Sequence, residues 1–171
     1  MANLKEVKNR IVSVVSTQQI TKAMKMVAAA KLRKAQDKIV RLRPYANKLH
    51  EILVGLNQSL AESEGDNVYG RQSAPDKVLV VVITSNRGLC GGFNSNVIKE
   101  TRRTIEKYHT QLNKGNLWFI AIGKKGFEYL RRQKQNILEE NNYLFNTLTF
   151  ENTSIVASKI MESFVSGKFD R

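Results

Sequence analysis

The sequence has few of the residues that mark disulfide-linked, zinc-binding or membrane-spanning proteins. Its 171 residues include one cysteine, two histidines, two prolines and one tryptophan. A single cysteine can form neither an internal disulfide nor a CxxC pattern. No apolar run is longer than that of residues 78–83, which is far short of the ~20 residues that cross a bilayer. The N-terminus carries frequent charges in place of a signal-peptide core. We therefore expect no zinc or redox site, no secretory signal and no membrane-spanning helix.

Acidic residues are also scarce in the first part of the chain. The formal net charge is +13, and residues 1–48 hold twelve lysines and arginines against two acids, Glu6 and Asp37. A segment of this charge density favours an anionic partner, which can be a nucleic acid, a membrane surface or an acidic protein.

Apolar residues in this basic segment recur at alternating steps of three and four. They are Leu4, Val7, Ile11, Val14, Ala28, Leu32, Ala35, Ile39 and Leu42, and the frame continues through Ala46, Leu49, Leu53, Leu56 and Leu60. Between Val14 and Ala28 the frame falls on Gln18, Thr21 and Lys25, so a polar window interrupts the seam. The pattern predicts one long coiled-coil-type helix over residues 3–57.

The predicted helix is too long to lie on the rest of the chain. At 1.5 Å per residue it spans about 80 Å, several times the radius of a domain of this size. The seam therefore implies a partner helix from outside the sequence or a second copy of the chain. Pro44 predicts a kink in the helix and not its end, because the apolar frame continues through it.

The remainder of the sequence predicts an α/β domain. Residues 1–60 form the shaft-like helix, polar residues 61–77 form a linker, and residues 78–171 form the domain. β-Branched and apolar runs at 78–84 and 117–122 predict buried parallel strands. Helices are expected at 94–112, 124–132 and 153–165, the first with Val97, Ile98, Ile105 and Tyr108 facing inward. This order predicts a doubly wound, Rossmann-like sheet.

Two stretches of the domain are less regular. The segment 136–150 offers one further strand near "YLFNTLTF", while Glu139 and Glu140 are interpreted as a solvated turn. The final residues "GKFDR" resemble the start of a strand, so we expect the domain to be truncated at Arg171.

The segment "TSNRGLCGGFNSNV", residues 84–97, is the strongest candidate for chemistry. A P-loop needs a lysine that is missing here, since the nearest is Lys99, within the predicted helix. Gly88, Gly91 and Gly92 do not have the G-x-G-x-x-G spacing, and no acid follows at the ribose position. Backbone amides could still hold an anion. The favoured interpretation is a strand-to-helix turn in which glycines allow positive φ and Asn94 or Ser95 caps the helix.

Other catalytic groups are not expected. Neither His50 nor His109 is placed to activate Cys90, which we interpret as a small, buried, unreactive side chain. The sequence offers no paired carboxylates or metal-ligand cluster. We therefore predict no catalytic residues, no cofactor, no metal and no enzymatic activity of the chain itself.

Two motifs, which follow one another along the chain, resemble those of the γ subunit of F-type ATP synthases. They are "STQQITKAMKMVAAAKLRKAQ" (16–36), followed by "RPYA", and "ITSNRGLCGGFN" (83–94). The resemblance implies the central-stalk rotor of the catalytic head, a non-catalytic subunit that couples proton or sodium flow to ATP synthesis and hydrolysis at the β subunits. It also implies that family members continue beyond residue 171 into a C-terminal helix, which pairs antiparallel with the N-terminal one.

The resemblance further implies partners and a location. The partners are the α and β subunits, ε and δ, and the membrane ring of c subunits. Gln19, Thr21, Lys22, Met24 and Lys25 match the part of the shaft that meets an acidic loop of β. The absence of a cysteine-bearing insertion and of a transit peptide suggests a bacterial form, peripheral to the cytoplasmic face of the cell membrane.

Three alternatives remain from the residues alone. They are a nucleotide-dependent enzyme with a helical arm, a basic nucleic-acid or anionic-membrane binder, and a coiled-coil scaffold. The sequence shows no signature of specific nucleic-acid recognition. Because the apolar side chains of the seam need a partner helix to bury them, the isolated chain is expected to self-associate in antiparallel pairs.

Overall fold

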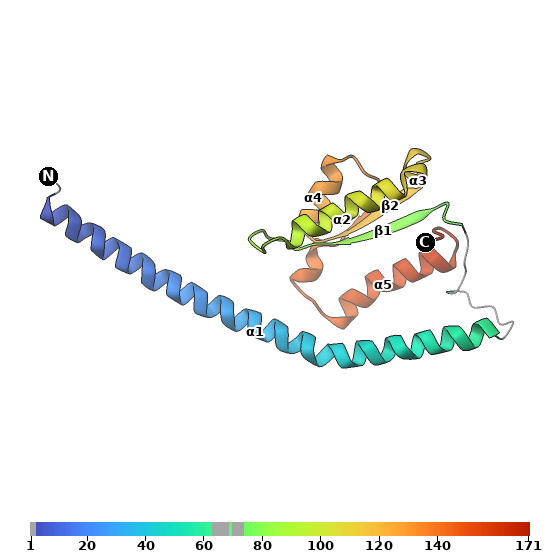
Figure 1. Ribbon diagram of the computed structural model, residues 1–171, viewed down its shortest axis with the longest axis horizontal. Coiled ribbons are helices and arrows are strands. Elements are labelled where there is room, and N and C mark those ends of the chain that lie inside the picture. Colours follow the sequence, from blue (N-terminus) through green and yellow to red (C-terminus); the bar gives the residue numbers. More distant parts are fainter. Residues whose placement is uncertain (1–2, 63–68, 70–73) are drawn as a thin grey trace. The chain divides into compact units, whose positions relative to one another are not determined.

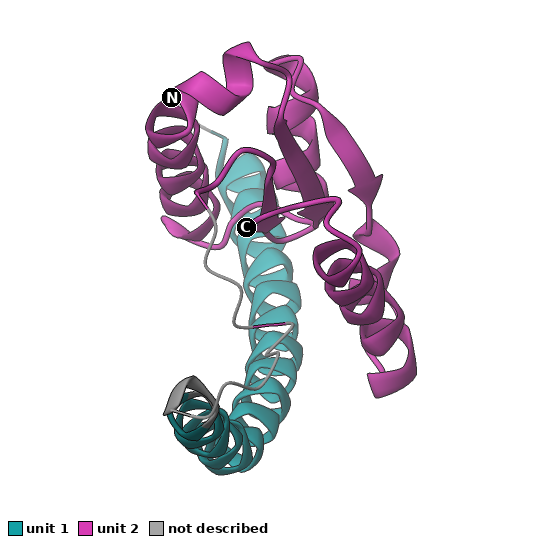
Figure 2. Cartoon of the chain, turned by 90° about the vertical axis from the view of Figure 1, so that its right-hand side faces the viewer, with its two compact units in different colours: residues 1–66 teal, residues 67–171 magenta. Residues whose placement is uncertain are grey.

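The computed structural model describes residues 3–62, Tyr69 and residues 74–171. The chain divides into two compact units, residues 1–66 and 67–171, which Figure 2 colours separately. Most of the predicted linker, 63–68 and 70–73, lies outside the described residues, as does the side chain of Leu60.

The first unit is a single helix. Helix α1 runs from Leu4 to Glu62, five residues past the predicted end at residue 57. Asn3 precedes it, with its side-chain oxygen accepting a hydrogen bond from the Lys5 amide at 3.3 Å, as N-terminal capping residues do. Pro44 lies inside the helix, and Figure 1 shows α1 as one continuous ribbon with a bend in it. The prediction that the helix continues through Pro44 is confirmed.

The second unit is built on a parallel sheet. Strands β1 (Val78–Ile83), β2 (Leu117–Ile122) and β3 (Ile137–Glu140) lie in the order β1-β2-β3. Val78 is in register with Leu117 and Ile83 with Ile122. The first two strands are apolar throughout because helices cover the sheet on both faces.

Helices α2 (Phe93–Lys107), α3 (His109–Asn113) and α4 (Lys124–Arg132) supply the crossovers between the strands. A 3₁₀ turn, η1 (Asn142–Phe145), then leads to α5 (Phe150–Val165). Figure 1 shows α5 on the opposite side of the sheet from α2 and α4. The predicted fold class, a long helix followed by a doubly wound α/β domain, is therefore confirmed.

The core of this unit lies between the sheet and the crossover helices. Its fully buried members come from β1, β2 and α4, and helix α2 packs against them through the four predicted residues, Val97, Ile98, Ile105 and Tyr108. The buried cluster consists of Val78, Val82, Leu117, Phe119, Ala121, Tyr129 and Leu130.

Three local predictions were wrong. The helix expected at 94–112 is interrupted at Tyr108, whose φ of −105° and ψ of 31° end α2 before α3 begins. The third strand is Ile137–Glu140 and not "YLFNTLTF", whose first residues lie in η1. Glu139 and Glu140 therefore belong to a strand and not to a turn. The segment Ile137–Glu140 is short and half polar, and its low intrinsic preference for a strand was overridden by backbone pairing with β2.

The final residues lie against β1. No strand is assigned to 167–171, but the Asp170 amide donates to the Lys77 carbonyl at 2.8 Å, and the Leu79 amide donates to the Arg171 carbonyl at 2.8 Å. Phe169 beside them is 2% exposed. The strand-like character expected of "GKFDR" thus appears as backbone hydrogen bonding to the edge of β1.

Candidate partner-binding helix

The polar window of α1 forms one shallow surface. Thr21, Lys22 and Lys25 line a depression together with Ser13, Val14, Thr17 and Gln18. The other two predicted contact residues, Gln19 and Met24, are exposed on the same helix but do not line it. The structure therefore brings three of the five predicted residues together and places the remaining two beside them.

Some polar side chains of the window form hydrogen bonds within α1 itself. The Thr17 hydroxyl donates to the Ser13 carbonyl at 2.9 Å, and the Thr21 hydroxyl donates to the Thr17 carbonyl at 2.7 Å. Such bonds to the preceding turn satisfy the hydroxyl protons locally. The Gln18 amide and the ammonium groups of Lys22 and Lys25 are further donors of this surface.

The apolar seam on either side of the window is exposed. Every described side chain of α1 is exposed; Leu4 is exposed to 88%, Leu32 to 59% and Leu42 to 62%. A contiguous apolar surface of this kind marks an interaction site. The positions that the sequence assigns to the seam, from Leu4 to Leu42, are thus available to a partner helix.

The glycine-rich segment, by contrast, uses its polar groups to hold the domain together. The buried Thr84 hydroxyl donates to the Gly123 carbonyl at 3.2 Å and accepts from the Gly126 amide at 2.7 Å. The Asn86 side chain accepts from the Lys124 amide at 2.9 Å and donates to the Asn142 carbonyl at 2.9 Å.

These bonds occupy the amides at the start of α4. The Lys125 amide also donates to the Ser85 carbonyl, at 3.2 Å. A helix N-terminus holds an anion through free N–H groups, and here residues 84–86 already accept from all three amides. The segment therefore joins the loops that follow β1, β2 and β3.

Two predictions about the geometry of this segment need correction. Helix α2 is preceded by Gly92 without a side-chain cap, so neither Asn94 nor Ser95 is the N-cap. Asn94 instead accepts from the Ser85 amide at 3.0 Å. Among the three glycines only Gly91 has positive φ, of 61°, and Leu89 shares that conformation. Tertiary hydrogen bonding competed with capping for the Asn94 side chain.

Cys90 is exposed and not buried as predicted. Its Sγ atom lies 3.1 Å from Asn94 Nδ2 and 3.8 Å from Ser85 Oγ. These neighbours include neither a histidine nor a lysine that could activate it as a nucleophile. The sequence could not reveal its exposure, because no local pattern indicates where the tip of the loop points.

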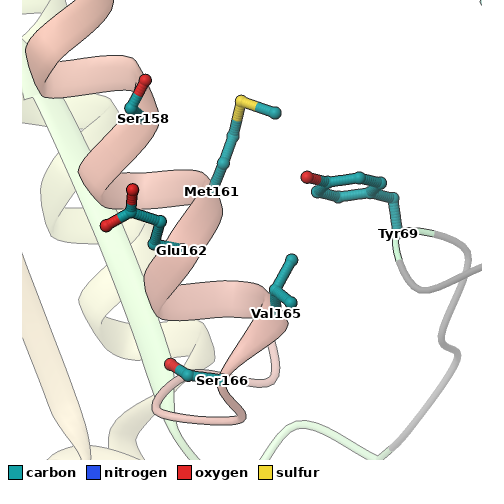
Figure 3. Close-up of a pocket in the computed structure, with 6 residues that line it drawn as sticks. All are labelled: Tyr69, Ser158, Met161, Glu162, Val165 and Ser166. Carbon is teal, nitrogen blue, oxygen red and sulfur yellow. The ribbon is translucent and has the colours of Figure 1, made fainter.

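An open cavity of about 550 Å³ lies beside α5, and no pattern in the sequence indicates it. Its lining residues are Tyr69, Ser158, Met161, Glu162, Val165 and Ser166. Figure 3 shows the Tyr69 ring across the cavity from Met161 and Val165. This lining holds one carboxyl group and neither a histidine nor a lysine, so it lacks an acid–base pair for catalysis.

The described residues bear on two further kinds of site, a metal-binding cluster and a membrane-spanning helix. No group of three or more histidine, cysteine or acidic side chains that could hold a metal ion occurs among the described residues. None of the described helices is both long and apolar enough to cross a membrane.

Comparison with known proteins decides the family. The family model described as ATP synthase matches residues 3–171. The ATP synthase gamma chain of Flavobacterium johnsoniae is 50% identical over 171 residues, which is 100% of this chain and 58% of that relative. The chain belongs to the ATP synthase γ family.

Other relatives agree in both identity and coverage. The gamma chain of Cytophaga hutchinsonii is 46% identical over 172 residues, covering 100% of this chain and 58% of that relative. The gamma chain of Chlorobaculum tepidum is 42% identical, with 100% and 59% covered. The resemblance drawn from the two motifs is confirmed. This γ-family chain spans less than two thirds of the length of these relatives.

Proposed function

We propose that this chain is part of the central-stalk rotor of an F-type ATP synthase. In this role α1 lies within the ring of α and β subunits and couples ion flow through the membrane sector to ATP synthesis and hydrolysis at the β subunits. The chain itself is non-catalytic. The observation that carries the proposal is an exposed helix of 59 residues with an apolar seam, a polar window and a basic surface, in a chain of the γ family.

The remaining partners follow from the same role. The α/β domain meets ε, δ and the ring of c subunits, and the assembled complex is peripheral to the cytoplasmic face of a bacterial membrane. The chain binds no nucleotide and no specific nucleic acid. In isolation its exposed seam leads it to self-associate weakly, because the basic side chains of two copies repel one another.

The charge of α1 supports a rotating contact. A rotor must exchange one set of contacts for an equivalent set at each step, and a few very strong contacts would hold it in place. Exposed ion pairs contribute roughly 0–1 kcal/mol each. Lys22 and Lys25 lie on long flexible side chains of the window, so they can pair in turn with acidic loops on successive β subunits.

A hybrid subunit tests the proposal. Residues 1–171 would replace the matching region of the Flavobacterium johnsoniae gamma chain, and ATP-driven ion pumping and ATP synthesis would be measured in membrane vesicles. The hybrid should assemble and couple. Lys22→Ala/Lys25→Ala should reduce coupling several-fold, while the control Lys99→Ala/Arg102→Ala, which removes the same charge from exposed positions on α2, should not.

Two results would refute the proposal. One is a hybrid that assembles with α and β but does not couple. The other is equal coupling by both double variants, because it would mean that the window lysines contribute nothing beyond net charge.

A further inference from the structure

The side chains that flank the apolar seam of α1 carry charge of only one sign. With Leu4 as heptad position a and Val7 as d, the seam continues in frame to Leu56. Positions e and g, which lie beside the seam, face the partner helix in a coiled coil. Between residues 3 and 52 the charged side chains at e and g are all basic: Lys8, Arg10, Lys22, Lys31, Lys38 and Arg43.

The acidic residues of α1 lie elsewhere on its surface. In the same frame Glu6 is at c, while Asp37 and Glu51 are at f. Glu51 forms an ion pair at 3.0 Å with Lys48, which is at c. Positions c and f point away from a partner helix, so these carboxylates do not neutralise the basic flanks of the seam.

This arrangement opposes pairing between two copies of the chain. In a parallel pair the g positions of one helix face the e positions of the other, and in an antiparallel pair g faces g and e faces e. Either orientation brings lysines and arginines opposite one another. Like charges at these positions act against a wrong partner.

We propose that the seam of α1 selects a partner helix with apolar a and d positions and acidic e and g positions. The apolar seam supplies the attraction, and the five basic side chains at e and g outside the polar window supply the discrimination. This selectivity belongs to α1 itself and does not depend on the stalk role. Self-association of the chain through the seam is correspondingly weak at low ionic strength and strengthens as salt screens the repulsion.

Two synthetic peptides test the selection directly. Both have about five heptads with leucine at a and d; one carries glutamate at every e and g, and the other lysine. Binding to the 171-residue chain is measured by fluorescence anisotropy at low and high salt. We expect the glutamate peptide to bind at least about tenfold more tightly than the lysine peptide at low salt. The difference should shrink at high salt.

Two matched variants separate position from net charge. Lys31→Glu/Lys38→Glu changes two g positions, and the control Lys34→Glu/Arg41→Glu changes two interleaved c positions by the same charge. The first variant should bring the two peptides to within about threefold of each other, whereas the control should keep most of the preference. Circular dichroism at 222 nm checks that both variants retain α1.

Three outcomes would overturn the proposal. Equal binding of both peptides at low salt is the first. Equal loss of preference in both variants is the second, because it would show that only net charge matters. The third is displacement of the glutamate peptide by duplex DNA at comparable concentration, which would assign the basic surface to nucleic acid.

Discussion

At the scale of single residues, Thr84 and Gly123 determine how the loops at the carboxyl edge of the sheet fit together. Gly123 has a φ of 104°, and a Cβ atom there would lie 2.0 Å from the Thr84 carbonyl oxygen. The conformation is strained for any L side chain, and the contact involves backbone that cannot rotate away. The position therefore requires glycine.

Gly123→Ala should accordingly destabilise the α/β domain by more than about 2 kcal/mol. Gly88→Ala is the matched control, because a Cβ there meets nothing within 4 Å; it should change stability little. Chemical denaturation followed by tryptophan fluorescence of Trp118 in β2 measures both. Equal midpoints for the two variants would show that the close approach of Gly123 to Thr84 is not needed.

A second residue-scale feature is the ion pair between β3 and α5. The Lys159 ammonium lies 2.5 Å from a Glu139 carboxylate oxygen. The hydrogen bond from Lys159, with a second from Asn141, holds the pKa of Glu139 below its ordinary value of 4.5. A lowered carboxyl pKa contributes stability that is present above 4.5 and is lost as the pH falls through the lowered pKa.

Lys159→Met should therefore reduce the stability of the domain at neutral pH and make it less sensitive to acid than the wild type. The unfolding midpoints of both proteins, measured at intervals from pH 7 downward, should converge as the pH falls below the lowered pKa of Glu139. Midpoints that stay a constant distance apart at every pH would argue that the lysine acts only through packing of its aliphatic stem.

Residue-scale details were also the hardest to predict from sequence. The motif comparison gave no support for a phosphate loop at Gly88, Gly91 and Gly92, because the lysine and the acid that such loops need are missing. It could not show that Asn94 bonds to Ser85 instead of capping α2, or that Cys90 is exposed. Both depend on where the loop lies in three dimensions, which no local pattern records.

At the scale of secondary-structure elements, long periodic segments were predicted well. The 3-4 alternation of apolar residues gave α1, and continuous apolar runs gave β1 and β2 with boundaries within one residue. Strand β3 was misplaced because its sequence, ILEE, is half acidic and becomes a strand only by pairing with β2. Its identity depends on a neighbour about 20 residues away in the chain, and local propensity does not contain that information.

Pro44 provides a prediction for α1 as an element. Proline inside a helix removes one backbone hydrogen bond and clashes with the preceding turn, at a cost of roughly 3 kcal/mol. Pro44→Ala should raise the helical signal at 222 nm and the temperature at which α1 melts. An unchanged or lower melting temperature would indicate that the bent backbone of α1 accommodates the Pro44 ring without cost.

At the scale of the whole molecule, its two units contribute differently to function. The α/β domain buries an ordinary core and uses the polar groups of residues 84–86 in hydrogen bonds between its own loops. Helix α1 exposes its seam, its polar window and its basic flanks. Together with membership of the γ family, this division supports the proposal that α1 is the surface that binds partners.

The most direct test of this account compares two ligands of the same chain. The tagged chain would be co-expressed with the α and β subunits of a γ-family bacterium and purified, and the free chain would be titrated with Mg-ATP by calorimetry. We predict that α and β are retained with the chain, less so by Lys22→Ala/Lys25→Ala, and that Mg-ATP gives no binding heat. Tight Mg-ATP binding without retention of α and β would contradict the account.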